Sequence, residues 1–459
     1  MPVARGYCSG KRSRRPERRS PRVPMNRSDD NHSAPPPRDV SLVVEHLLRD
    51  EGAKMVATLT RIFGVEHLGL AEDVVQEALA RAWQTWPFYG VPKNPAAWIM
   101  RASRNLALDV VRREKVFRQK EVEISRLLEE RATINGAGFI EQEIADDCLR
   151  MMFVCCHPLV PLDAQAALAL KTLCGFSVTE ISRAFLTTEA AIAKRLARAK
   201  QRIREARIPF EIPSGDELGR RLDGVLQTLY LLFNEGYKDS VGEKLIREDL
   251  CHEAIRLAGQ LAQHPAGNRP RVHALLAMML LNGARLATRM DDQGNILLLK
   301  EQDRTRWDTA MISHGMVHLE QAASGDEITQ FHVQAGIAAC HCAAPDYEST
   351  DWPRILSLYD RLLQFDDSPV VALNRSVAVA NVHGPQAGRE AVAAIRDQDR
   401  LEGYYLFYAV LGEFEARMND PLAAAGYFRK SLQLAEVKSE QSFLLKRFQA
   451  CEEQLIDLA

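Results

Sequence analysis

The sequence predicts an all-α protein made of three helical parts. Apolar residues recur at helical spacing along most of the chain, alternating strand patterns are almost absent, and proline and glycine mark the breaks between helical segments. A chain of 459 residues is also too long for one ordinary domain. The predicted order is a disordered basic segment over 1–38, a helical module over 39–116, a flexible linker over 117–145, a second module over 146–208 and a helical extension over 216–459.

Charge is distributed unevenly along the chain. The formal net charge is only −2, but residues 1–209 carry 34 Lys and Arg against 25 Asp and Glu, while residues 210–459 carry 25 against 36. A basic first part favours a polyanion as its partner. The overall balance of 46% hydrophobic and 26% charged residues is that of a globular protein, which excludes collagen-like and wholly disordered classes.

Nothing in the sequence predicts a membrane protein, a metal site or an enzyme. No run of 18 apolar residues occurs, and the basic N-terminus, which starts at Met1 or Met25, lacks the apolar stretch of a secretory signal. We therefore expect a cytoplasmic protein without a cofactor. The cysteines lack the spacing of a zinc site. Cys155 and Cys156 are adjacent, and Cys340 and Cys342 flank His341, so neither pair shares a helix face. We therefore predict that the cysteines pack as small hydrophobic residues. No P-loop, nucleophile elbow or His-Glu-x-x-His motif is present.

The first module contains two helices with distinct polar faces. In the first, over 71–86, Pro87 predicts the end of the helix, and the acidic side of the first turns is either a favourable helix start or a docking face. The second begins at Asn94-Pro95, an N-cap followed by proline, and runs to 113. The predicted buried positions are Val74, Val75, Ala78, Leu79, Ala82, Trp83 and Trp86 in the first helix, and Ile99, Ala102, Leu106 and Val110 in the second.

Arginines and a tryptophan lie outside the apolar face of the second helix. Such a surface suits phosphate contacts and stacking on unpaired bases, although a basic helix face is more often simply solvated.

The second module has the layout of a helix-turn-helix. Ser177 and Glu180 form a capping box for a short helix over 178–185. A tight turn follows, in which Thr187 or Thr188 caps a second helix over about 189–204. Ile192, Leu196, Ala199 and Ile203 form the predicted buried face of that helix, and the cations lie opposite. An apolar back with a cationic front is what a recognition helix needs, so DNA binding is favoured over an ordinary amphipathic helix.

These two modules, in this order and spacing, resemble the conserved regions of an extracytoplasmic-function sigma factor of bacterial RNA polymerase. Ala71-Glu72-Asp73-Val74-Val75-Gln76-Glu77-Ala78 resembles the core of region 2, residues 94–109 resemble the region 2.3–2.4 block, and residues 147–205 resemble region 4. The resemblance implies a non-catalytic subunit that binds core RNA polymerase and directs promoter-specific transcription initiation.

The resemblance also implies roles for matching residues. The acidic face would dock on the clamp helices of the polymerase β′ subunit, the Trp98 face would meet the melted −10 element, and the second module would reach the −35 element and the β flap. The implied polymerase-docking residues are Glu72, Asp73, Gln76 and Glu77; those for the −10 element are Trp98, Arg101, Arg104, Asn105, Arg112 and Arg113; those for the −35 element are Thr188, Lys194, Arg195, Arg198 and Arg202.

The extension resembles the helical, tetratricopeptide-like extension of one sigma-factor subgroup, which implies a regulatory role and an unidentified protein or ligand partner. Residues 404–435 read as a repeat-like helix pair with Asn419-Asp420-Pro421 as its turn. A dense polar group is either a ligand or interdomain site or a structural network of ion pairs. Its members are Glu301, Asp303, Arg304, Trp307 and Asp308, and the further candidates for an interdomain or ligand site are Asn234, Glu235, Tyr237 and Arg247.

Two other functions compete with that of a sigma factor. A ligand- or peptide-responsive helix-turn-helix regulator would bind duplex DNA without core polymerase. A helical-repeat scaffold would not need its cationic helix face at all. Contact between the extension and the modules is also predicted, because their net charges are opposite.

Overall fold

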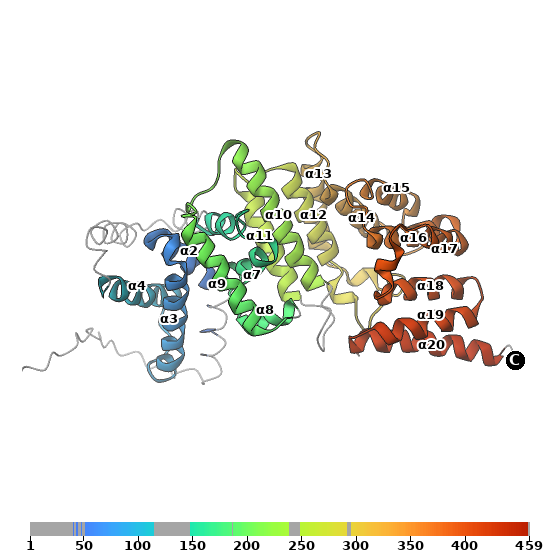
Figure 1. Cartoon of the computed structure of the whole chain (residues 1–459), viewed down its shortest axis with the longest axis horizontal. Coiled ribbons are helices and arrows are strands. Elements are labelled where there is room, and N and C mark those ends of the chain that lie inside the picture. The colour runs from blue at the N-terminus through green and yellow to red at the C-terminus, as the bar shows by residue number, and fades with distance from the viewer. Residues whose placement is uncertain are drawn as a thin grey trace, which may run out of the picture.

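The computed structural model describes residues 51–113, 147–185, 187–237, 248–291 and 295–457, with Val40, Val43, Val44 and Leu47. The predicted disordered segment over 1–38 and the linker over 117–145 lie outside these residues. The regular structure of the described part is helical, apart from one antiparallel bridge between Met290 and Ile296. The all-α class is therefore confirmed, and Figure 1 shows the helices in an elongated arrangement.

The helices of the two modules follow the predicted order. The first module contains α2 (Gly52–Phe63), η1 (Val65–His67), α3 (Leu68–Tyr89) and α4 (Pro95–Arg113). The second contains α7 (Leu162–Leu173), α8 (Val178–Ala184) and α9 (Glu189–Glu205), preceded by a helical stretch from residue 147.

The extension continues as a succession of helices that pack on their neighbours along the chain. Its first half contains α10 (Gly215–Tyr237), α11 (Glu248–Gln263), α12 (Pro270–Gly283), η2 (Leu286–Thr288), η3 (Arg304–Arg306), α13 (Thr309–Ala322) and α14 (Gln330–Ala343). Its second half contains α15 (Trp352–Leu362), α16 (Pro369–His383), α17 (Pro385–Ala393), η4 (Gln398–Leu401), α18 (Tyr405–Arg417), α19 (Pro421–Leu434) and α20 (Lys438–Asp457).

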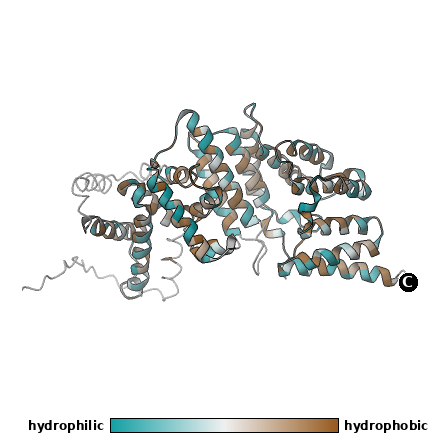
Figure 2. Ribbon diagram, viewed as in Figure 1, coloured by the Kyte–Doolittle hydropathy of each residue, from teal (hydrophilic) through white to brown (hydrophobic). Residues whose placement is uncertain are grey.

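One hydrophobic core runs through both modules and into the extension. It includes Phe63 of α2, Phe153 and Leu168 of the second module, and Val225 and Leu276 of the extension. Hydropathy colouring shows apolar positions turned toward neighbouring helices along this part of the molecule (Figure 2). Three smaller clusters hold the C-terminal helices.

Contact between the extension and the second module is made by this core and by buried hydrogen bonds. Arg221 of α10 is buried and donates to the carbonyl oxygen of Phe153, and Thr228 donates to Gln165 Oε1 of α7 at 3.2 Å. The predicted contact is present, but its reason was wrong, because burial of apolar side chains and not opposite net charge joins the surfaces.

Three local predictions need correction. Trp83 is 53% exposed and does not belong to the buried stripe of α3. The helix does not stop at Pro87 but continues to Tyr89, where Gly90 ends it with a φ of 81°. On α4 the buried face is rotated toward Ser103 and Ala107, which leaves Val110 39% exposed.

The predicted C-terminal helix pair is present as α18 and α19. Asn419 takes a left-handed φ of 59° in the turn, and Asp420 caps α19 by accepting a hydrogen bond from the Ala423 backbone N–H at 2.9 Å. Gly412 lies against Phe428 across the pair, and a Cβ at this glycine would come within 2.9 Å of the buried ring.

Replacement of this glycine tests the packing. Gly412→Ala is expected to lower the stability of the extension by about 1–3 kcal/mol, because the fully buried Phe428 ring has no space to move into. Gly426→Ala on α19 is the matched control, since a Cβ there meets nothing within 4 Å; it should raise stability by about 0.5–1 kcal/mol through helix propensity. Thermal unfolding of the full chain followed by circular dichroism measures both, and equal effects would contradict the close contact.

Candidate functional site

The turn between α8 and α9 is built by two caps. Ser177 N–H donates to Glu180 Oε2 at 2.7 Å and Glu180 N–H to Ser177 Oγ at 3.1 Å, which forms the predicted capping box of α8. Thr188 caps α9 by accepting from the Ala191 N–H at 3.2 Å. These contacts fix the angle at which α9 leaves the turn.

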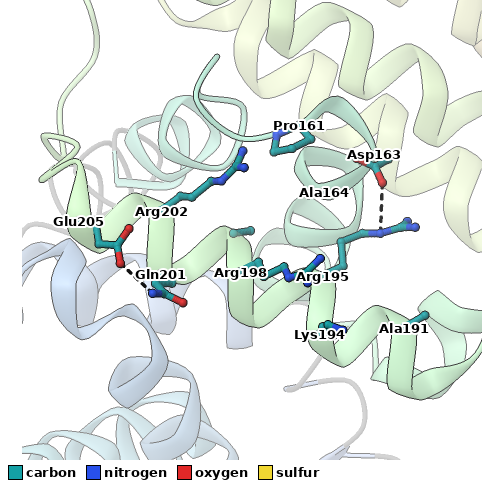
Figure 3. A pocket seen from close by; sticks show the side chains of 11 residues that line it. Pro161, Asp163, Ala164, Ala191, Lys194, Arg195, Arg198, Gln201, Arg202 and Glu205 are labelled. Carbon is teal, nitrogen blue, oxygen red and sulfur yellow. Dashed lines mark hydrogen bonds and ion pairs between the residues drawn. The ribbon is translucent and has the colours of Figure 1, made fainter.

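The cationic side of α9 lines a groove of about 630 Å³ against the start of α7 (Figure 3). Arg195 Nε pairs with Asp163 Oδ2 at 3.2 Å, and Arg202 donates to the Leu159 carbonyl oxygen at 3.2 Å. Lys194 and Arg198 are exposed and form no ion pair with any other residue that the structure describes. The structure thus brings all four predicted cations of α9 to one groove and leaves two of their charges available.

The predicted polar face of α4 is partly assembled. Trp98, Arg101 and Asn105 follow helical spacing on one side, with Arg101 and Asn105 exposed. Trp98 is held edge-on against Trp86 of α3, with ring centroids 5.5 Å apart. Arg104 lies off this side and is partly buried. The side chains of Arg112 and Arg113 lie outside the described residues.

Exposed aromatic side chains at the end of α3 were missed in the sequence. Phe88 and Tyr89 are strongly exposed, as is Trp83 one turn earlier. Their signal was present, because Phe88 and Tyr89 stand beyond the apolar stripe of α3 and just before the Trp98 helix. Exposed aromatic rings are side chains on which unpaired bases can stack.

The predicted acidic face on α3 loses one member. Asp73, Gln76 and Glu77 are exposed, as the prediction requires. Glu72 is only 6% exposed and does not belong to that face. Its position follows from helical geometry, because residue 72 lies on the side of α3 that packs on the second module.

Glu72 connects the two modules. Its Oε1 accepts a hydrogen bond from Thr172 of α7 at 2.9 Å, and its Oε2 pairs closely with Lys200 of α9. Lys200 was not among the predicted site residues, since a lysine on a basic helix gives no signal for a partner 128 positions away. The contact draws the two modules together through one buried carboxylate.

The polar group of the extension consists of capping residues and of residues that belong to an arginine cluster. This cluster contains Arg285, Arg289, Arg304 and Tyr237. Asp303 caps η3 and Asp308 caps α13, while Glu301 accepts from the Leu298 N–H at 2.8 Å, so these three carboxylates serve as caps and form no ion pair with a described residue. Tyr237 and Arg304 belong to the cluster, Asn234 and Glu235 lie about one turn before Tyr237, Trp307 is buried, and Arg247 lies outside the described residues.

The thiols lie in apolar surroundings. Cys155 and Cys156 are fully buried, and burial raises the pKa of Cys156 to about 12. Among the residues that the structure describes, no group of three or more His, Cys, Asp or Glu side chains is arranged to hold a metal ion. Within the same residues, no helix has the length and apolar character required to cross a bilayer.

Comparison with known proteins agrees with this division of the chain. Residues 48–116 match sigma-70 region 2, residues 150–203 match sigma-70 region 4, and residues 221–323 match a family of unknown function, DUF6596. The chain is 37% identical over 391 residues to the uncharacterized protein R00370 of Rhizobium meliloti (strain 1021), a match that covers 85% of this chain and 91% of that protein. It is 26% identical over 153 residues to the ECF RNA polymerase sigma factor SigK of Mycobacterium ulcerans (strain Agy99), which covers 32% of this chain and 80% of SigK. No solved structure matches it significantly.

The contact between the modules can be tested by removing its carboxylate. Glu72→Ala is expected to cost about 1–3 kcal/mol, because Thr172 and Lys200 lose the acceptor that they share. The loosened modules should also separate, so small-angle X-ray scattering should record a larger radius of gyration.

Glu77→Ala is the control for this substitution. Glu77 lies on the same helix but, among the described residues, its ion pair is with Arg81 at the surface, at 3.0 Å, so its loss should cost no more than about 0.5 kcal/mol. Equal losses of stability for the two variants, with no change in radius of gyration, would contradict a connecting role for Glu72.

Proposed function

Because the chain belongs to the extracytoplasmic-function sigma factors of the sigma-70 family, with a C-terminal helical extension, we propose that it binds core RNA polymerase and directs promoter-specific transcription initiation. The observation that carries the proposal is the presence in one chain of two separate nucleic-acid faces. One is the aromatic and cationic side of α4, and the other is the cationic groove of α9. The protein acts by binding and not by catalysis.

The groove of α9 reads the duplex at the −35 element. Lys194 and Arg198 contact phosphates or base edges directly, since neither is held by another described side chain. In the free protein Arg195 pairs with Asp163, and Arg202 donates to the Leu159 carbonyl oxygen. Each arginine gives up this contact when it binds DNA.

The α4 face meets the −10 element in its melted form. Arg101 and Asn105 supply polar contacts, and Trp98 provides a ring that Trp86 holds in place. The exposed rings of Phe88 and Tyr89, at the end of α3, offer a further stacking surface.

Polymerase docks on the exposed acidic face of α3, formed by Asp73, Gln76 and Glu77. Glu72 lies next to this face and holds the second module against α3, so docking and separation of the modules are coupled. The extension regulates that step, because α10 shares a core with the second module and any change in its position is transmitted to α7.

Run-off transcription with core polymerase tests the proposal. The full chain, added to core enzyme and fragments of its own genome, is expected to yield promoter-dependent transcripts that core enzyme alone does not produce. Absence of such products, together with tight duplex binding in the absence of core enzyme, would identify a helix-turn-helix regulator instead.

The two exposed cations of α9 provide a residue-level prediction. Lys194→Ala and Arg198→Ala should each weaken promoter binding by the holoenzyme and reduce the slope of log K against log salt by about 1, because each removes one phosphate contact. Arg204→Ala is the matched control: Arg204 is an exposed cation of the same helix outside the groove, and its loss should leave both quantities nearly unchanged. Filter binding over a salt series measures them, and equal effects at all three positions would indicate only a general charge effect.

A further inference from the structure

Two arginines meet at one tyrosine in the middle of the extension. Arg285 donates from Nε and Nη2 to the hydroxyl of Tyr237, at 2.9 and 2.5 Å. Arg289 lies over the face of the same ring, 3.9 Å from its centroid, and donates to the Tyr237 carbonyl oxygen at 2.6 Å. Two guanidinium groups are thus fixed side by side at the end of α10.

Neither arginine has a carboxylate partner within the described part of the chain. The nearest acidic residue in sequence, Asp291, accepts hydrogen bonds from the backbone and side chain of Asn295. Burial lowers the pKa of Arg289 and the neighbouring charge of Arg285 adds to this effect; the groups that oppose them are Tyr237, Cys251 and Tyr405, none of which is a carboxylate. Guanidinium groups stay protonated in proteins, so among the residues that the structure describes these two positive charges have no carboxylate counter-charge.

A third arginine, Arg304, lies near this pair, together with ring nitrogens of His341 and Trp307. Arg304 donates to the carbonyl oxygens of His341 and Ala344, both at 2.8 Å, and so is held at the C-terminal end of α14. Burial lowers the pKa of His341 to about 3, and the nearby positive charges of Arg285 and Arg304 contribute to this decrease. His341 Nδ1 and the indole N–H of Trp307, which is 3% exposed, are buried and have no hydrogen-bond partner among the described residues.

A positive charge that is partly withdrawn from water is unfavourable without a partner. Proteins normally pair such groups with a carboxylate or bind a counter-ion beside them. Guanidinium forks match tetrahedral and planar oxyanions in geometry, and Arg285 Nη1 and Arg289 Nε and Nη2 make no hydrogen bond to any described residue. Two arginines balance a doubly charged group better than a single carboxylate.

We propose that Arg285 and Arg289, with Arg304 beside them, bind the phosphate group of a small anionic ligand. Because the groups are partly buried between helices, the ligand is a small molecule or the free ion and not a nucleic-acid backbone. The site itself does not depend on the transcriptional function proposed above.

The position of this site gives the ligand a means of acting on the rest of the protein. The segment between α12 and α13, which carries Arg285, Arg289 and Arg304, lies between the α10–α12 helices and the C-terminal helices in Figure 1. Arg289 faces Tyr237 of α10 and lies within electrostatic reach of Tyr405 of α18. A bound phosphate would therefore hold together the half of the extension that packs on the second module and the half that does not.

Binding of inorganic phosphate to the purified full chain tests the site. Thermal unfolding is followed over a phosphate series at constant ionic strength, with chloride as the balancing ion, and isothermal titration calorimetry gives the affinity. A saturable rise of several degrees in the unfolding temperature is expected, and sulfate should share it whereas succinate should not. No rise beyond that in chloride, or a preference for succinate, would overturn the proposal.

Variants assign the effect to the cluster. Arg285→Gln with Arg289→Gln should weaken phosphate binding at least tenfold, while Arg306→Gln, which removes an exposed arginine of the same segment, should retain it. Equal binding by the double variant and the natural chain would overturn the assignment. If the double variant does not fold, Arg289→Lys keeps the charge but removes the fork, and unchanged affinity in that variant has the same consequence.

A last comparison identifies the source of the phosphate. Glucose 6-phosphate and AMP are titrated beside inorganic phosphate. Tighter binding of an organic phosphate would identify a phosphorylated metabolite as the ligand, and equal affinities would identify the free ion. Because these are binding measurements without polymerase, their failure is distinct from failure of the proposed transcriptional function.

Discussion

The packing of α10 on the second module is the contact on which the rest of the arrangement depends. Its apolar side completes a core that already contains Phe153 and Leu168, and Arg221 on the same helix satisfies a carbonyl oxygen of the second module from inside that core. Without α10, that face of the module would be open to water. The extension is therefore part of the folded unit and not an appendage joined by a tether, and whatever moves α10 also acts on α7.

The two modules share this core and are also joined by buried polar contacts. Glu72 shares its carboxylate between α7 and α9, whereas the neighbouring acidic residues of α3 remain at the surface. The same core joins the second module to the extension and to the first module, and two polar contacts add to it between the modules: Glu72 with Thr172 and Lys200, and Arg61 of α2 with Asp147 at 3.0 Å.

Local patterns predicted local structure well. The capping box at Ser177, the Thr188 cap and the Asn419 turn follow from residues three or four positions apart, and the cations of α9 share a groove because helical spacing places them there. Contacts between distant residues were not predictable. The burial of Glu72 depends on Lys200, and the arginine cluster depends on Tyr237, 48 positions before Arg285. Trp83 was misassigned because periodicity gives the apolar side of a helix but not how much of it a neighbour covers.

The shared core also imposes an order on the synthesis of the protein. Ile203 of α9 belongs to the same core as Leu276 of α12, and the chain between them must leave the ribosome before that core can close. At about 5–20 residues per second, translation of this stretch takes roughly 4–15 s. Until α12 has been made, the nascent core stays open and exposes apolar side chains. Chaperone capture or premature association is favoured during that interval, and a pause in translation before α12 would prolong it.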